Sequence, residues 1–282
     1  MPGNEASEGI DLEPSGGLFV IEHRPVARLD PGGTTPPGEA AGSREWPLVV
    51  LVHGSLDRAT SFSRVMRRLE DLHVLAYDRR GYHRSRDVRP VATSLGEHVA
   101  DLLELVDGRR CVVIGHSYGG DVAIGAAIES PESVVGLAAY EPPLPWLEWW
   151  PRHGGRSALE GMDPSDFAEG FFRRMVGDES WERMAEGDRD ERRADGPALL
   201  AELAAIRDTR PQFDPNEIRV PAVFGRGSRS VPHHLRSAET LAGAAPRGEL
   251  FEISGAAHGA HLTHPEAFAA MVRRVLDRVG SG

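Results

Sequence analysis

The sequence lacks lysine and contains a single cysteine, and each shortage excludes a class of chemistry. All 32 basic residues among the 282 are arginines, so no lysine can form a Schiff base or act as a general base. Cys111 alone cannot form an internal disulfide or a metal site built from cysteines. No stretch is long and apolar enough to span a membrane. Lysine-based covalent catalysis and disulfide stabilisation are therefore excluded.

Basic residues are also outnumbered, with 43 acidic side chains giving a net charge of −11. This balance disfavours nucleic acid and anionic membranes as partners, and it favours solubility. The first residues lack the charged and apolar regions of a signal peptide. We therefore expect a cytoplasmic protein that acts on a small molecule. The sequence leaves the oligomeric state open.

One stretch in the middle of the chain organises the rest. The apolar residues 111–114 run directly into Gly115-His116-Ser117-Tyr118-Gly119, and a helix-compatible run, 121–129, follows. Glycines two residues before and after Ser117 fit a turn too tight for side chains at those positions. A serine on such a strand-to-helix turn has an exposed hydroxyl, and the N-terminus of the helix favours an oxyanion. The pattern predicts that Ser117 is a nucleophile.

Short apolar strands alternate with amphipathic helices on both sides of this stretch. This rhythm predicts an α/β fold with a mostly parallel central sheet and helices on both faces. Residues 18–26 fit an edge strand. The other predicted strands are 47–52, 73–77, 111–114, 133–140, 220–224 and 249–253, and the predicted helices are 60–69, 95–106, 121–129, 232–243 and 265–279.

The alternation breaks over residues 144–216, which have helical stretches, charged turns and no convincing strand. We interpret this segment as a helical cap inserted into a core formed by 17–143 and 217–282. Residues 1–16 are rich in Gly, Pro, Ser and acidic residues and predict a flexible tail. The loop 30–43 has no periodicity. The insertion holds four of the five tryptophans: Trp146, Trp149, Trp150 and Trp181.

Candidate functional residues follow several predicted strands, and the carboxyl ends of parallel strands meet at one edge of a sheet. His258 lies in a loop of small residues after the last strand, where its imidazole can reach Ser117 and act as the base. We interpret His261 and His264 as surface or capping residues. His116 is expected to pack beside the turn, and His53 to brace the loop after the 47–52 strand.

Stabilisation of an oxyanion needs two donors. The first candidate is the backbone N–H of Tyr118, and the second is that of Ser55, with Leu56 as its alternative. Asp57 follows in the same loop and is a candidate for contact with substrate. Aromatic residues of the insertion, Trp146, Trp149 and Phe171 among them, either bind an apolar substrate or only pack the insertion onto the core.

These motifs together resemble the α/β-hydrolase family, in particular its small single-chain members with a helical cap. The resemblance covers residues 46–279 and implies the fold of that family and a serine hydrolase activity. Serine at position 117, where dehalogenases and epoxide hydrolases carry aspartate, argues against those two reactions. The resemblance also makes 78–81 a structural loop. The matching motifs are Leu51-Val52-His53-Gly54-Ser55, Asp78-Arg79-Arg80-Gly81, Gly115-His116-Ser117-Tyr118-Gly119-Gly120 and Gly255-Ala256-Ala257-His258.

The sequence departs from the family pattern at the triad acid. The usual acid position falls within 225–232, which contains no carboxylate and holds Ser228 and Ser230 instead. Some family members place the acid after the preceding strand, where this chain has Glu141. Glu141 is therefore our candidate acid; its alternative role is a cap or ion pair where the chain enters the insertion. Asp57 and Asp121 are weaker candidates.

The sequence thus predicts a serine hydrolase that cleaves an ester, thioester or related acyl bond through Ser117, His258 and Glu141. No metal and no organic cofactor is expected. Two alternatives stay open, because this fold hosts many functions. One is an enzyme that does not hydrolyse, such as a cofactor-free oxidase, a haloperoxidase-like enzyme or an acyltransferase. The other is a binding module with a degraded triad.

Overall fold

The computed structural model describes residues 17–25, 46–151, 159–207 and 210–281. The predicted tail 1–16 and loop 30–43 lie outside these ranges. A seven-stranded sheet has the order β1-β3-β2-β4-β5-β6-β7, in which β1 pairs antiparallel and every other pair is parallel. This confirms the predicted α/β fold. The strands are β1 (Val20–His23), β2 (Leu48–Val52), β3 (Val74–Tyr77), β4 (Cys111–His116), β5 (Val134–Tyr140), β6 (Ala222–Gly227) and β7 (Gly248–Ile253).

Helices cover both faces of the sheet because alternate residues of the central strands point in opposite directions. Val50 and Val52 belong to the core cluster beneath α2 (Leu95–Val106), α3 (Tyr118–Glu129) and α8 (Pro232–Ala244). Val49 and Leu51 belong to the second cluster, beneath α1 (Ser63–Met66) and α10 (Pro265–Val279). Fully apolar strands such as β2 are therefore buried on both faces, as parallel sheets require.

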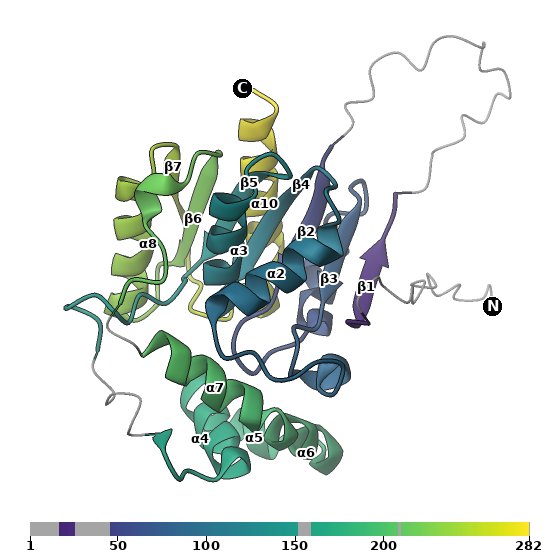
Figure 1. The fold of residues 1–282 in the computed structure, drawn as a ribbon, viewed down its shortest axis with the longest axis vertical. Helices are drawn as coiled ribbons and strands as arrows, with labels where there is room; N and C mark the ends of the chain where they lie inside the picture. The colour runs from purple at the N-terminus through teal and green to yellow at the C-terminus, as the bar shows by residue number, and fades with distance from the viewer. Residues whose placement is uncertain (1–16, 26–45, 152–158, 208–209, 282) are drawn as a thin grey trace, which may run out of the picture.

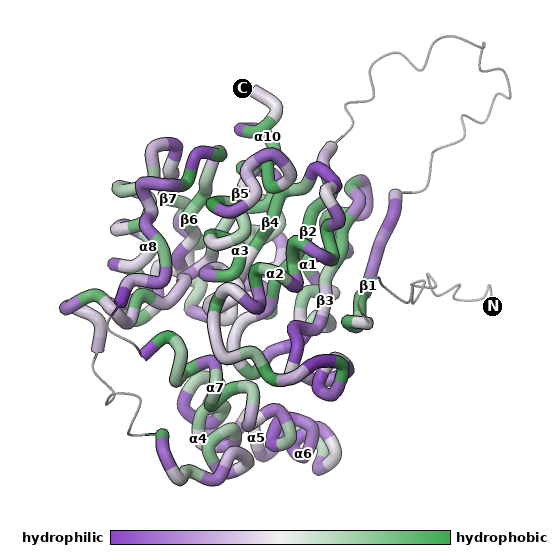
Figure 2. Tube along the Cα trace, viewed as in Figure 1, coloured by the Kyte–Doolittle hydropathy of each residue, from purple (hydrophilic) through white to green (hydrophobic). Residues whose placement is uncertain are grey.

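Between β5 and β6 the described residues form helices and turns only. Figure 1 shows α4, α5, α6 and α7 gathered beyond one end of the sheet. We call them the inserted helices. In Figure 2 the central strands are largely hydrophobic, whereas α6 is mostly hydrophilic. The bounds are α4 (Pro164–Val176), α5 (Asp178–Glu182), α6 (Glu186–Ala194) and α7 (Gly196–Ile206), followed by the 3₁₀ helix η4 (Pro215–Glu217).

The structure differs from the predicted helix over 60–69. That segment contains the 3₁₀ helix η1 (Ala59–Phe62) and the four-residue α1, after which the N–H groups of Arg68 and Leu69 bond three residues back. The tighter turns end the α-helix early. A second 3₁₀ helix, η2 (His83–Ser85), follows β3, and α9 (Ala260–Thr263) precedes α10. None of the described helices is long and apolar enough to cross a membrane.

Candidate active site

Ser117 occupies a strained turn between β4 and α3. Its φ and ψ are 53° and −128°, a conformation that non-glycine residues rarely adopt and that is found at functional sites. A Cβ at Gly115 would lie 2.1 Å from the Gly119 carbonyl oxygen, and one at Gly119 would lie 2.2 Å from that of Val52. The predicted need for glycine on both sides of Ser117 is thereby confirmed.

The loop that follows β2 passes directly against this turn. A Cβ at Gly54 would lie 2.8 Å from the Ser117 Cβ, so the loop brings Ser55 and Leu56 to the nucleophile candidate. Leu56 has a φ of 53° and packs in a small apolar cluster with Phe171. These backbone positions are the ones predicted to hold the donors to an oxyanion.

The Glu141 carboxylate is fully buried and accepts four hydrogen bonds. Its Oε1 receives the Gly227 N–H at 2.8 Å and the Ser230 hydroxyl, and its Oε2 lies 2.8 Å from His258 Nδ1 and 2.9 Å from His234 Nδ1. Burial alone would raise the pKa of Glu141, but the hydrogen bonds from the two histidines hold it well below its usual range. Glu141 is therefore ionised, and all four acceptor positions of its carboxylate are used.

The Glu141 carboxylate bonds to two residues of the 225–232 loop, which contains no carboxylate of its own. Ser230, which lies where the usual acid is expected, donates its hydroxyl to Glu141. The Glu141 carboxylate, which extends from the end of β5, thus reaches the position that Ser230 occupies in this loop. Glu141 itself has a φ of 50°, a left-handed conformation that directs the chain at the strand end. The imidazole of His258 is the predicted partner of this carboxylate, and their 2.8 Å contact agrees with the prediction.

His258 is held both through its ring and through its backbone. Its Nδ1 faces Glu141, and its backbone oxygen accepts a hydrogen bond from His116 Nε2 at 2.8 Å. Burial, followed by the neighbouring His234, lowers the pKa of His258 to about 4, against the opposing effect of Glu141. His258 is therefore neutral at pH 7 and able to accept a proton. Since His116 directly precedes Ser117, this contact ties the His258 loop to the turn.

Sequence reasoning missed His234. It lies in the first turn of α8 and its ring is 4.2 Å from that of His258, centroid to centroid. Trp150 also stacks on the His234 ring, with the two centroids 5.7 Å apart. The available signal was its position, four residues after Ser230 in the loop that lacks the usual acid. A histidine at this position, just after β6, contacts the Glu141 carboxylate at the end of β5 because β6 and β5 are neighbours in the sheet.

A second buried network lies beneath the loop after β2. Arg79 and Glu202 are fully buried and form an ion pair of 2.7 Å, and Ser55 donates its hydroxyl to the same carboxylate. Tyr82 also donates to Glu202, at 3.1 Å. Arg79 comes from the 78–81 loop that was interpreted as structural, and Glu202 comes from α7. The inserted helices are thus joined to the loop that carries Ser55.

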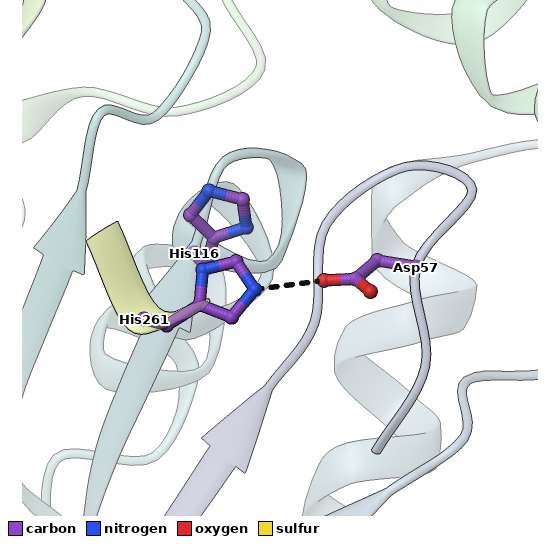
Figure 3. A group of neighbouring side chains, drawn as sticks. All are labelled: Asp57, His116 and His261. Atoms are coloured by element: carbon purple, nitrogen blue, oxygen red, sulfur yellow. Dashed lines mark ion pairs between the residues drawn. The ribbon is translucent and has the colours of Figure 1, made fainter. Parts of the chain in front are cut away.

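A third cluster corrects the interpretation of His261 as a surface or capping residue. His261 is only 2% exposed, and its ring centroid lies 4.2 Å from that of His116. Its Nε2 is 3.2 Å from Asp57 Oδ2 (Figure 3). It is buried because α9 packs it against Phe62, which is distant in the sequence, and against Phe268 of the neighbouring α10. Asp57 thus faces His261, although it was predicted to contact substrate.

The other site candidates have varied surroundings. Trp146 packs edge-to-face on Phe213 at 5.2 Å within the main core cluster. Trp149 lies beneath the Arg236 guanidinium, at 4.7 Å. Both contacts fit the packing interpretation. Asp121 is buried, and its carboxylate oxygens have no hydrogen-bond partner among the described residues. Burial raises its pKa well above the usual value.

Comparison with known proteins identifies the family. The model of the Alpha/beta hydrolase family matches residues 49–271, so the chain belongs to that family. A hydrolase from Pseudomonas aeruginosa PA01 has the same fold, with a TM-score of 0.70, 23% identity and coverage of 96% of this chain and 99% of that one. The predicted fold family is therefore confirmed.

Two curated relatives differ in how much of their length the chain matches. It is 26% identical over 227 residues to "Putative carbamate hydrolase RutD" of Pseudomonas syringae, covering 73% of this chain and 84% of that protein. It is 29% identical over 283 residues to "Polyketide synthase ThaQ" of Burkholderia thailandensis, covering 94% of this chain. The chain spans only 13% of the length of ThaQ. The family and its hydrolase-named members support a hydrolase of this fold.

Proposed function

We propose that this protein is a serine hydrolase that cleaves an ester, thioester or related acyl bond through a covalent acyl-enzyme. The observation that carries the proposal is the 2.8 Å contact between Glu141 Oε2 and His258 Nδ1, together with the strained turn that presents Ser117. A carboxylate on Nδ1 fixes the tautomer in which Nε2 carries a lone pair. That lone pair is what the serine hydroxyl needs from a general base.

The reaction then takes two stages. His258 Nε2 accepts the Ser117 proton as Oγ bonds to the acyl carbon, and the same proton passes to the leaving group when its bond breaks. In the second stage His258 takes a proton from water, the hydroxide attacks the acyl carbon, and the proton returns to Ser117 Oγ. Glu141 stabilises the imidazolium that forms in each stage. Its four hydrogen-bond donors keep it ionised and in place.

The negative oxygen of each tetrahedral intermediate needs two donors. We assign this role to the backbone N–H groups of Tyr118 and Ser55, with Leu56 as the alternative to Ser55. The close approach of Gly54 to Ser117 supports this assignment. The link from the Ser55 hydroxyl to Glu202 holds this part of the loop in place.

We propose that the inserted helices act as a cap over the site and that the substrate is small and apolar. Phe171 supports this, because it packs with Leu56 of the oxyanion loop. Trp146 and Trp149 are weaker candidates for substrate contact, since their aromatic faces pack on Phe213 and Arg236. The proposed reaction itself requires only protein side chains and water.

A screen of short and aromatic p-nitrophenyl esters and matching thioesters tests this function. We expect turnover of at least one of them, and Ser117→Ala should lose it by a factor on the order of 10⁴ or more. Circular dichroism of the variant checks that its fold is retained. Turnover that persists unchanged in Ser117→Ala would refute the proposed nucleophile.

A further inference from the structure

Three side chains outside the proposed triad converge beside the nucleophile turn. Asp57 comes from the loop after β2, His116 ends β4 and His261 lies on α9, and Figure 3 shows all three turned toward one another. One ligand atom from each lies within 4.8 Å of the other two. Both histidines are at least nine-tenths buried, and the Asp57 side chain is 16% exposed.

The histidine nitrogens in this cluster are not satisfied by the protein. His116 Nε2 faces the carbonyl oxygen of His258, which only accepts, so Nε2 carries the proton and Nδ1 of the neutral ring carries a lone pair. That Nδ1 is buried and has no hydrogen-bond partner among the described residues. The same holds for His261 Nδ1, and His261 Nε2 has only the 3.2 Å ion-pair contact with Asp57. Buried nitrogens without partners are rare in folded proteins and need an explanation.

We propose that Asp57, His116 and His261 form a binding site for a divalent transition-metal ion of the zinc type. Two imidazoles and one carboxylate are a common ligand set for Zn²⁺, with a fourth position left for water or another ligand. Mg²⁺ and Ca²⁺ prefer oxygen ligands and fit this set poorly. The hydrogen bond from His116 Nε2 to a backbone carbonyl is the support that a metal-ligating histidine usually has.

Neighbouring groups define the charge of the site. The Ser61 hydroxyl donates to Asp57 Oδ1, which leaves Oδ2 on the side of His261. The Arg192 guanidinium donates to the carbonyl of Leu56, the residue before Asp57, and adds positive charge nearby. This positive charge weakens the binding of any cation that is held only by electrostatic attraction. Binding therefore has to come from coordination by the two imidazoles. The site therefore favours ions with a high affinity for nitrogen.

The site does not depend on the proposed hydrolase activity. It lies against the turn of Ser117, since His116 is the preceding residue and Gly54 packs on both of them. A metal ion here would fix the His116 ring, and through the 2.8 Å bond to the His258 carbonyl it would also fix the His258 loop. Binding itself, and not activity, is therefore the measurement that tests it.

The test is titration of chelator-treated, full-length protein with Co²⁺, followed by visible absorption, and with Zn²⁺, followed by calorimetry. We expect one ion per chain and weaker binding by at least about tenfold in His261→Ala and in Asp57→Asn, since each lacks one of three ligands. His264→Ala, which removes a half-buried histidine three residues further on and outside the cluster, should bind as the parent does. Thermal unfolding of each variant without metal verifies that it is folded.

A second variant separates this site from the Glu141 cluster, whose His234 and His258 are also close enough to share an ion. His234→Ala should retain the binding of one ion. Failure of the parent protein to bind either ion would overturn the proposal. Binding that is lost in His234→Ala but kept in His261→Ala would also overturn it.

Discussion

The two clusters of histidine and carboxylate, one around Glu141 and one around Asp57, differ in how their polar atoms are paired. Glu141 accepts four hydrogen bonds, two of them from the facing nitrogens of His234 and His258. In the Asp57 cluster, His116 and His261 retain buried nitrogens without a hydrogen-bond partner in the described part of the chain. The same residue types thus form one cluster in which every carboxylate acceptor is used and one cluster in which buried histidine nitrogens have no hydrogen-bond partner among the described residues.

This difference separates two kinds of site. A carboxylate with every acceptor position filled holds its histidine in one orientation and one tautomer, as proton transfer requires. Nitrogens left without partners in a buried place cost free energy unless something else binds them. The first arrangement fits a catalytic acid and base, and the second fits a ligand site. Substitutions in either cluster, compared with substitutions in the other cluster or in buried groups outside both, test this difference.

Replacing Glu141 with glutamine should have the largest effect. An amide presents one oxygen, and its NH₂ group would face N–H or O–H donors that now bond to the carboxylate. It also cannot stabilise the His258 imidazolium by charge. We expect kcat/KM on the best ester to fall by about 10³-fold or more.

Asp57→Asn should lose much less activity. Glu239→Gln, in an exposed pair with Arg226, serves as a control for the change from glutamate to glutamine itself. Equal losses in Glu141→Gln and Asp57→Asn would abolish the distinction between the clusters.

Glu202 provides a third buried carboxylate, paired with arginine instead of histidine. Glu202→Gln leaves the fully buried charge of Arg79 without its ion-pair partner. We expect the free energy of unfolding to fall by about 3–5 kcal/mol, measured by urea denaturation. Glu266→Gln removes a partner from a solvent-exposed pair with Arg68 and should cost much less than Glu202→Gln, because water screens the pair. A similar cost for both variants would show that Glu202 contributes no more than a surface ion pair.

Histidines outside both clusters make stability depend on pH. Burial, and then the charge of Arg79, lower the pKa of His53 from its ordinary 6.5 to about 4, and the same causes lower the pKa of His98. Between pH 4 and pH 6.5 these histidines bind more protons in the unfolded chain than in the folded protein. The free energy of unfolding therefore falls as the pH decreases from about 6.5 to 4. His53 alone accounts for about 3 kcal/mol of this loss. Urea denaturation at pH 7, 6, 5 and 4.5 measures the slope, and stability that is constant or increases toward pH 5 would disprove it.

The smallest of these effects concerns His234. His234→Phe keeps an aromatic ring beside Trp150 but removes one of the four donors to Glu141. A hydrogen bond to a charged group contributes about 1.5 kcal/mol or more, so we expect kcat/KM to fall by about tenfold. His261→Phe, the corresponding change in the other cluster, should cost less in metal-free protein. A larger loss in His261→Phe than in His234→Phe would reverse the assignment of the two clusters.

The sequence predicted the fold and the residues at the strand ends because those features depend on local patterns. Apolar runs predicted the buried strands, and the glycines around Ser117 predicted a turn that leaves no room for a Cβ. Glu141 was predicted from its place after β5 and from the absence of a carboxylate in the 225–232 loop. Its contact with His258 agrees with that reasoning.

The parts that the sequence did not predict depend on packing between distant segments. His261 is buried in part by Phe62 of η1, and periodicity in a four-residue helix does not reveal this. The contact of His234 with Glu141 spans 93 residues and requires the order of β5 and β6 in the sheet. The ion pair between Arg79 and Glu202 likewise joins a core loop to an inserted helix. No local pattern encodes these contacts.

The most direct test of the central claim is the reaction of the protein with a fluorophosphonate probe, followed by intact mass spectrometry and peptide mapping. The account predicts one adduct per chain on Ser117, no adduct in Ser117→Ala, and a strongly reduced labelling rate in Glu141→Gln but not in Glu239→Gln. A parent protein that stays unlabelled, or an adduct on any other residue, would contradict it.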